Sequence, residues 1–218
     1  MKRWFALFSF LILCAASLVA TSLQAGAAPL GSATADFDNL RPNRNETAWG
    51  RFVADALRAS TQSDIAFVYA FALKAGTLKA GPIENADIDA LLPLGGDEVV
   101  TLTITGAQLR AALERAVQAY PTGSPAFLHL SGFVAEFNAQ APINRRLTMV
   151  RYKGREVGDQ DVFTVAMPVG LARDAGYSTM WDSKKAQRTG DTLRDAVAGF
   201  IRDRQEITPD ATVRLAPQ

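Results

Sequence analysis

The sequence contains one cysteine and one histidine, and its net charge is close to zero. Cys14 lies inside an apolar N-terminal stretch, so the rest of the chain can form no disulfide bond and offers no thiolate to zinc or to a substrate. His129 alone cannot supply the zinc sites that combine several histidines or cysteines. The formal charge of +1 creates no field that would draw the protein to nucleic acid or to an acidic membrane. We therefore expect no nucleic-acid partner, no metal ligands and no cofactor.

Three common catalytic and nucleotide-binding motifs are also missing. The chain contains no G-x-x-x-x-G-K-[ST], no G-x-G-x-x-G and no G-x-S-x-G sequence. His129 lies between Leu128 and Leu130, an apolar context that is more typical of a hydrogen-bonded core residue than of a base or a ligand. The sequence therefore identifies no catalytic residue.

The N-terminus has the pattern of a secretory signal peptide over residues 1–27. A basic start, Met1-Lys2-Arg3, precedes an apolar run over residues 4–19, and Ala25-Gly26-Ala27 is a small-residue cleavage signal. The alternative is an uncleaved membrane anchor, for which the run is short. We expect a secreted or periplasmic protein, with membrane attachment only if this segment is retained.

The remainder divides into two parts. Residues 28–40 are rich in small and polar residues with little periodicity, which predicts a flexible leader. Residues 41–218 carry alternating helical and strand patterns and are expected to form one domain.

Helices are expected at four places in this domain. Asn45 is a candidate N-cap for an amphipathic helix that contains Trp49, and Asn85 for a short helix that ends before Pro93. Thr105-Gly106-Ala107-Gln108 is a capping box for a third helix, and Thr189 is a candidate cap for the last. Residues 170–176 are expected to form a loop or one helical turn.

Strands are indicated by β-branched and alternating segments. They are expected at residues 65–69, 98–105, 127–130, 133–137, 146–152, 162–167 and 211–215. The fold class is therefore mixed α/β (α+β), with a mixed sheet packed against about four amphipathic helices.

Four arginines lie near the first helix: Arg41, Arg44, Arg51 and Arg58. They form either a solvated face or the rim of an anion site, because a guanidinium offers a bidentate fork to phosphate or carboxylate.

Several short segments, taken in order between residues 41 and 181, together resemble the C-terminal domain of 5'-nucleotidases of the bacterial periplasmic UDP-sugar hydrolase type. The segments are Arg44-Asn45-Glu46-Thr47, Gly50, Asp55-Ala56-Leu57-Arg58, Ala80-Gly81-Pro82-Ile83, Leu92-Pro93, Leu102-Thr103-Ile104-Thr105-Gly106, Leu130-Ser131-Gly132-Phe133, Tyr152-Lys153-Gly154 and Gly176-Tyr177. The resemblance implies a 5'-nucleotidase C-terminal-domain-like fold.

The resemblance also implies a division of labour. In that family a separate N-terminal metallophosphatase domain holds two metal ions, and the C-terminal domain supplies nucleotide recognition. With one histidine, this chain is not expected to run the two-metal mechanism by itself.

The recognition motifs implied by the resemblance are altered in this chain. Its glycine-rich Asn/Ser-Gly-Gly-Ile-Arg loop is matched by residues 70–74, with Phe71 and Ala72 in place of glycines and Lys74 at best in place of arginine. The family's Pro-Phe-Gly-Asn segment becomes residues 93–96, so that Leu94 and Gly96 replace the stacking phenylalanine and the asparagine. The second aromatic residue of the base clamp falls near Gly170.

The family's Gly-Gly-Asp-Gly-Tyr loop is matched by residues 173–177, with Asp174 as the acid and Tyr177 as the tyrosine. Candidate ligand-binding residues are therefore Arg41, Arg44, Lys74, Asp174 and Tyr177, for a small anionic ligand.

Three functions remain open from the sequence. The first is a binding or accessory module that is not catalytic alone, with an altered ligand or an envelope protein as partner. The second is the recognition half of a split nucleotide hydrolase that works with a separate metallophosphatase. The third is an unrelated α/β envelope domain.

Overall fold

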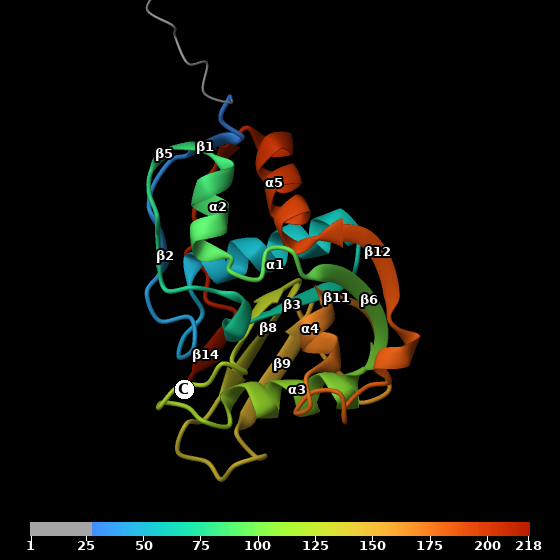
Figure 1. Cartoon of the computed structure of the whole chain (residues 1–218). Helices are drawn as coiled ribbons and strands as arrows, with labels where there is room; N and C mark the ends of the chain where they lie inside the picture. Colours follow the sequence, from blue (N-terminus) through green and yellow to red (C-terminus); the bar gives the residue numbers. More distant parts are fainter. Residues whose placement is uncertain (1–27) are drawn as a thin grey trace, which may run out of the picture.

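The computed structural model describes residues 28–218, so the expected signal peptide at residues 1–27 lies outside the described part of the chain. Figure 1 shows a central sheet with helices on both sides and smaller sheets around it. The architecture is the mixed α/β fold that the sequence predicts.

The central sheet has five strands in the order β12-β6-β11-β3-β7. Their bounds are β3 (Ile65–Tyr69), β6 (Glu98–Thr105), β7 (Leu128–Ser131), β11 (Val162–Pro168) and β12 (Gln187–Thr192). Only β3 and β11 run parallel to each other, and the remaining pairs in this sheet are antiparallel. All five residues of β3 are buried, as expected of a strand covered on both faces.

Five α-helices form within residues 28–218. They are α1 (Ala48–Thr61), α2 (Asn85–Leu91), α3 (Gly106–Val117), α4 (Val169–Arg173) and α5 (Leu193–Arg204). Figure 1 shows α1 and α5 on one side of the central sheet and α3 and α4 on the other, while α2 lies beside α5. The long helices bury one apolar stripe each, which includes Trp49 in α1 and Leu109 in α3.

A second sheet has the order β10-β9-β8-β14. Its strands are β8 (Phe133–Phe137), β9 (Leu147–Tyr152), β10 (Arg155–Glu156) and β14 (Leu215–Pro217). β7 passes directly into β8 through Gly132, whose φ is +91°. A Cβ on Gly132 would lie 2.4 Å from the carbonyl oxygen of Asp64, so both the backbone conformation and the close approach require glycine.

Two small sheets hold the first described residues. One has the order β13 (Glu206–Ile207), β1 (Gly31–Ala33) and β5 (Gly81–Ile83), and the other pairs β2 (Phe37–Asn39) with β4 (Gly76–Leu78). The 3₁₀ turns are η1 (Ala70–Ala72) and η2 (Ser183–Lys185).

The flexible leader predicted for residues 28–40 is wrong. This segment forms β1 and β2, and Leu30 and Phe37 are buried in the main core. The Phe37 ring meets the Phe52 ring edge-on, with centroids 5.4 Å apart. The strands escape sequence analysis because their partners lie far away in the chain, so that three-residue pairings leave no local periodicity.

Strand positions are predicted well. The expected ranges at residues 65–69, 98–105 and 133–137 match β3, β6 and β8 to the residue, whereas the terminal strand lies at Leu215–Pro217 rather than at 211–215.

Helix caps are predicted less well. The capping box at Thr105 is confirmed, but the N-caps of α1, α2 and α5 are Thr47, Glu84 and Thr192. At α1 the Thr47 hydroxyl accepts from the Gly50 N–H and donates to the buried side chain of Asn39.

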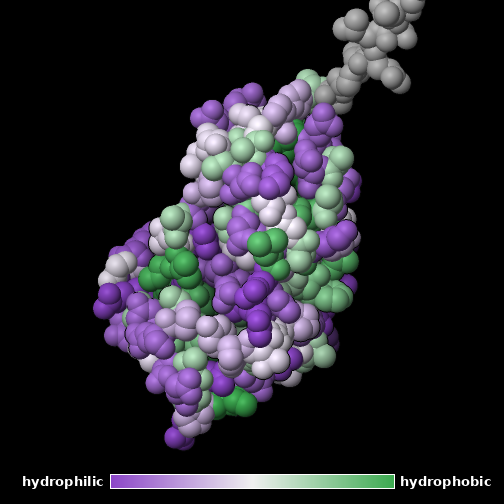
Figure 2. Space-filling model, turned by 90° about the vertical axis from the view of Figure 1, so that its left-hand side faces the viewer, coloured by the Kyte–Doolittle hydropathy of each residue, from purple (hydrophilic) through white to green (hydrophobic). Residues whose placement is uncertain are grey.

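Five large apolar side chains are exposed in the described part of the chain. They are Leu40, Phe71, Ile143, Val162 and Val213. On the face shown in Figure 2 the hydrophobic atoms form small separate patches among hydrophilic ones. Among residues 28–218, no helix has both the length and the apolar character needed to cross a bilayer.

Candidate functional site

The carboxyl ends of β3 and β11 lie next to each other because the two strands are parallel neighbours. β3 ends at Tyr69 and continues into η1, whereas β11 ends at Pro168 and continues into α4. Ligands of α/β sheets bind outside the carboxyl ends of the strands, where the following segments diverge. We call Tyr69, Phe71, Asp97, Gly170 and Asp174, which gather at this edge, the strand-end site.

Gly170 allows Tyr69 and Asp97 to converge. The Gly170 N–H, in the first turn of α4, donates to Oδ2 of Asp97 at 2.9 Å. A Cβ on Gly170 would lie 2.7 Å from Oδ2 of Asp97 and 2.7 Å from the hydroxyl oxygen of Tyr69. Both oxygens therefore sit over the bare α-carbon, and a side chain at this position would push them apart.

Burial governs protonation at this site. It raises the pKa of Asp97, although the N–H groups of Gly170 and Glu98 favour the ionised carboxylate. Burial also raises the pKa of Tyr69 to about 12, and the nearby charges of Asp97 and Asp174 act in the same direction. The Tyr69 hydroxyl therefore stays protonated at physiological pH and can donate a hydrogen bond.

Phe71 stands on the outside of the strand-end site. Its side chain is 60% exposed, and its ring lies against that of Tyr69 with centroids 5.8 Å apart at an interplanar angle of 52°. Exposure of a large aromatic ring to water carries a cost that burial against a ligand or partner would remove.

Asp174 and Tyr177 share one turn after α4. Oδ1 of Asp174 accepts from the N–H groups of Gly176 and Tyr177, at 2.8 and 3.3 Å. Tyr177 is buried, and its hydroxyl donates to the carbonyl oxygen of Ala126. Its ring stacks on Trp181, with centroids 5.7 Å apart. Asp174 therefore lies at the strand-end site, while Tyr177 braces the loop from inside.

Arg41, Arg44 and Lys74 lie elsewhere. The Arg44 N–H donates to the Arg41 carbonyl within one turn, and the Arg44 guanidinium donates through Nε to the Thr122 carbonyl. Arg44 lines a separate cavity of about 190 Å³ beside Tyr120. Lys74 is exposed at the end of the segment that follows η1. A binding role for these three residues remains a prediction.

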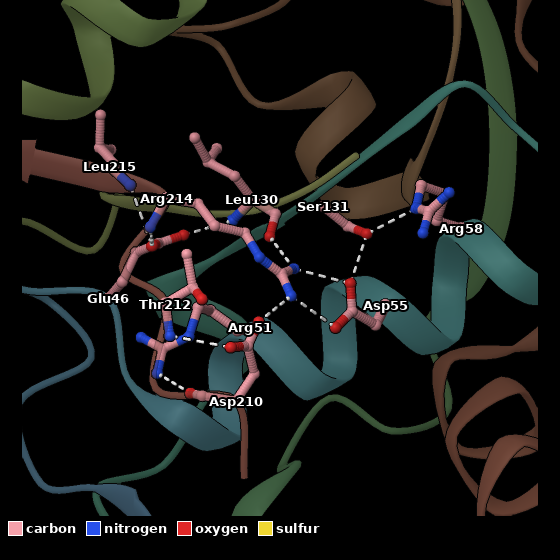
Figure 3. A network of polar contacts seen from close by, with 10 residues as sticks. All are labelled: Glu46, Arg51, Asp55, Arg58, Leu130, Ser131, Asp210, Thr212, Arg214 and Leu215. Atoms are coloured by element: carbon pink, nitrogen blue, oxygen red, sulfur yellow. Dashed lines mark hydrogen bonds and ion pairs between the residues drawn. The ribbon is translucent and has the colours of Figure 1, made fainter. Parts of the chain in front are cut away.

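The four arginines near α1 do not form one rim. Arg51 is buried and donates to the carbonyl oxygen of Asp210, whereas Nε of Arg58 donates to the Ser131 hydroxyl at 2.7 Å. Figure 3 shows both in a polar network that also includes Asp55, Asp210 and Arg214.

His129 is the hydrogen-bonded core residue that the sequence predicts. It is fully buried, its Nε2 lies 3.0 Å from the Pro42 carbonyl, and its Nδ1 accepts from the Thr47 N–H at 3.3 Å. Since a carbonyl only accepts, the proton is on Nε2. Burial lowers the pKa of His129 to about 3, so the ring is neutral at physiological pH.

Metal-binding side chains do not converge in the described residues. No three His, Cys, Asp or Glu side chains within 28–218 are grouped so that they could hold an ion. The donor set therefore does not fit the two-metal centre that the family resemblance places in a separate domain.

Sequence reasoning missed Tyr69, Asp97 and the exposed position of Phe71. Tyr69 ends a segment predicted as a strand, and Asp97, just before the strand predicted at residues 98–105, is given no role by the sequence. Tyr69 ends one buried strand and Asp97 directly precedes another. Because residues at strand ends line the edge of a sheet where ligands bind, these positions could have identified both as site candidates.

Comparison with known proteins identifies the relatives of this chain. Residues 24–182 match the family model described as the 5'-nucleotidase, C-terminal domain. This match begins upstream of residue 41, where the resemblance in the sequence begins, and overturns the alternative of an unrelated α/β domain.

Among curated proteins, the endonuclease YhcR of Bacillus subtilis is 24% identical over 192 residues, which cover 86% of this chain and 15% of that protein. Among solved structures, a 5'-nucleotidase precursor of Thermus thermophilus superposes with a TM-score of 0.79 at 20% identity, covering 88% of this chain and 39% of its own. The NAD nucleotidase of Haemophilus influenzae gives 0.74 at 19% identity, covering 87% and 38%. The chain thus spans less than two-fifths of these proteins, and the structural likeness shows a shared fold.

Proposed function

Because this chain belongs to the 5'-nucleotidase C-terminal domain family, we propose that it is a recognition module, not catalytic on its own, which binds an altered ligand or a protein partner. The contact surface is the strand-end site. The observation that carries this proposal is Phe71, an exposed aromatic ring at the edge where ligands of α/β sheets bind.

The site offers two kinds of contact. Phe71 presents an aromatic face, and stacking of a flat ring on such a face contributes on the order of 1–3 kcal/mol. Beside it, the protonated hydroxyl of Tyr69 donates, and the carboxyl group of Asp97 accepts. The matching ligand has a flat ring with a hydrogen-bond acceptor and a donor on one edge, or is a peptide side chain of that chemistry.

The ligand differs from that of the family because the two-sided clamp is absent from the expected positions. Leu94 packs partly buried against the core, Gly96 has no side chain, and Gly170 is required by Asp97 and Tyr69. One aromatic face at Phe71 replaces two. Loss of one stacking face weakens the binding of a nucleotide base by roughly 1–3 kcal/mol, which moves the dissociation constant of a nucleotide from micromolar toward millimolar.

Isothermal titration of the purified protein with AMP, adenosine and UDP-glucose tests the altered ligand. We expect no saturable binding at micromolar concentration. Micromolar affinity for any of the three would contradict the proposal.

An NMR titration tests the binding surface itself. Adenosine, nicotinamide and uridine, added one by one at millimolar concentration, should shift the amide resonances of Phe71 and Gly170. Phe71→Ala should abolish the shifts, and Leu40→Ala, which removes another exposed apolar side chain, should leave them in place. If no probe perturbs these amides, the strand-end site is not a recognition surface.

A second function is proposed from the family and from the two nucleotidases that share the fold. The chain would be the recognition half of a split nucleotide hydrolase, paired with a separate metallophosphatase. The test is phosphate release from AMP by a phosphatase encoded nearby, with and without this protein. An equal rate in both mixtures would rule the pairing out.

The site of action is proposed as the periplasm or the exterior of the cell, with removal of residues 1–27. Cell fractionation and N-terminal sequencing of the mature protein test this. A full-length chain in the membrane fraction would instead show that the segment is an anchor.

A further inference from the structure

A cavity of about 320 Å³ opens at the opposite end of β3 from the strand-end site. It lies between α1, the turn from β7 to β8, the turn after β9 and the segment before β14. Its position is defined by Gly132, which touches the backbone of Asp64 just before β3 begins. With five residues at about 3.3 Å each, β3 separates the two sites by roughly 16 Å.

Four cationic side chains line this cavity. They are Arg58, Arg151, Lys153 and Arg214, and the two carboxylates present are Asp55 and Asp210. The lining therefore carries two more positive than negative charges, on a protein whose overall charge is only +1.

Arg214 forms ion pairs with both carboxylates. Its guanidinium forms a two-pronged ion pair with Asp55, at 2.6 and 2.9 Å, and a third contact with Asp210 at 2.8 Å. Figure 3 shows these contacts converging on one guanidinium group. The side chain also donates to the Leu130 carbonyl, so Arg214 has little capacity left for a ligand.

Arg58, in contrast, is held in place but not neutralised. Its Nε donates to the Ser131 hydroxyl, which in turn donates to Oδ1 of Asp55. Among the described residues, no carboxylate lies within 4.0 Å of the Arg58, Arg151 or Lys153 side-chain nitrogens. The two terminal nitrogens of Arg58 remain available to a ligand, and the hydrogen bond from Nε to Ser131 already orients the guanidinium group.

Arg151 and Lys153 form the opposite wall. Arg151 is paired across the sheet with Val134, and Lys153 occupies the turn between β9 and β10, where its φ is +49°. The Lys153 ammonium lies 5.0 Å from the centre of the Tyr152 ring, which limits its motion. Three free cations thus surround one cavity from two elements.

We propose that this cavity binds a phosphate group, either inorganic phosphate or a small phosphomonoester. The planar guanidinium of Arg58, with two free nitrogens, can bind two phosphate oxygens at once. The Lys153 ammonium and the Arg151 guanidinium supply the remaining positive charge that balances the phosphate. The cavity has the size of a small-molecule site rather than of a surface stripe for a polymer.

Isothermal titration at constant ionic strength provides the test. Sodium phosphate and glycerol 3-phosphate are titrated into the purified protein, with sodium chloride as the blank. We expect saturable binding at one site per chain. Equal affinities would identify the phosphate group as the whole ligand, whereas tighter binding of glycerol 3-phosphate would identify a phosphomonoester.

Three variants locate the site. Arg58→Lys keeps the charge but removes the fork, and should weaken phosphate binding at least tenfold. The double variant Arg151→Ala with Lys153→Ala removes the opposite wall and should have a similar effect. Arg145→Ala removes an exposed cation before the other end of β9 and should change the affinity less than twofold.

Because Arg58, Arg151 and Lys153 are exposed, we expect the variants to fold, and circular dichroism checks this. Absence of saturable binding up to 10 mM phosphate, roughly the limit of a useful affinity, would overturn the proposal. An equal loss on Arg145→Ala would also overturn it, since that result indicates unspecific attraction. Binding of a single-stranded oligonucleotide that phosphate does not displace would assign the surface to nucleic acid instead.

Discussion

The buried imidazole of His129 should make the stability of this protein depend on pH between neutrality and pH 5. Its pKa is about 3 in the folded chain, against 6.5 for an ordinary histidine. Because the folded value is depressed, the contribution is complete above pH 6.5 and is lost as the pH falls toward 3. The unfolded chain takes up a proton in this window, whereas the folded core does not.

The magnitude follows from the size of the shift. A difference of one bound proton changes the free energy of unfolding by about 1.4 kcal/mol per pH unit, so between pH 6.5 and pH 5 the loss is about 2 kcal/mol. Two carboxyl groups oppose this effect. Burial raises the pKa of Glu46 and of Asp97, which contributes with the opposite sign.

A variant isolates the histidine from these groups. His129→Gln keeps a polar side chain but does not titrate, so the comparison uses the slope with pH and not the absolute stability. Urea denaturation of both proteins at pH 7.5, 6.5, 5.5 and 5.0 should show their difference in unfolding free energy shrinking by about 2 kcal/mol toward pH 5.

The chain has a single histidine, so its imidazole gives one set of resonances and can be followed directly. At pH 5 the ring should still be neutral, with the proton on Nε2. A titration midpoint near 6.5, or a stability difference that stays constant from pH 7.5 to 5, would refute the assignment of His129 to the core network.

Further predictions concern packing and ion pairs. Gly50→Ala places a Cβ 2.2 Å from Nδ1 of the buried imidazole and should destabilise the protein by about 3 kcal/mol or more in urea denaturation, since overpacking and lost hydrogen bonds outweigh helix propensity. Gly199→Ala meets nothing within 4 Å and should stabilise it by about 0.5–1 kcal/mol; a loss in both variants would contradict the packing argument. Arg214→Met leaves Asp55 unpaired in a largely buried position and should cost about 2–4 kcal/mol, whereas Lys79→Ala, at a highly exposed ion pair, should leave the denaturation midpoint unchanged. Equal midpoints for Arg214→Met and the parent would contradict the role of the network.

The buried network around α1 explains why the cap of this helix was misplaced. Thr47 is the N-cap, its hydroxyl donates to Asn39, and its N–H donates to the imidazole. Asn39 in turn donates to the Lys74 carbonyl. The choice of cap was therefore made by groups on β2, on the segment after η1 and on β7, none of which is local in sequence.

The same distinction applies to the candidate sites. The sequence matches residues 70–74 to a glycine-rich loop in altered form, but nothing local shows that Phe71 faces water. It groups Arg58 with Arg41, Arg44 and Arg51, as a solvated face or the rim of an anion site, yet the partners of Arg58 in the cavity are Arg151 on β9 and Lys153 after it.

Elements whose signal is local can be predicted from the sequence. A capping box at Thr105, an apolar stripe in α1 and a fully apolar strand at β3 each depend on residues within one turn or one strand of each other. The tertiary structure alone decided what depends on distant partners: the burial of residues 28–40, the convergence of Tyr69 and Asp97 over Gly170, and the pairing of Arg214 with Asp55, which leaves Arg58 free. The reason is that burial and charge compensation are properties of surfaces brought together by folding, and a linear pattern carries information only about neighbours along the chain.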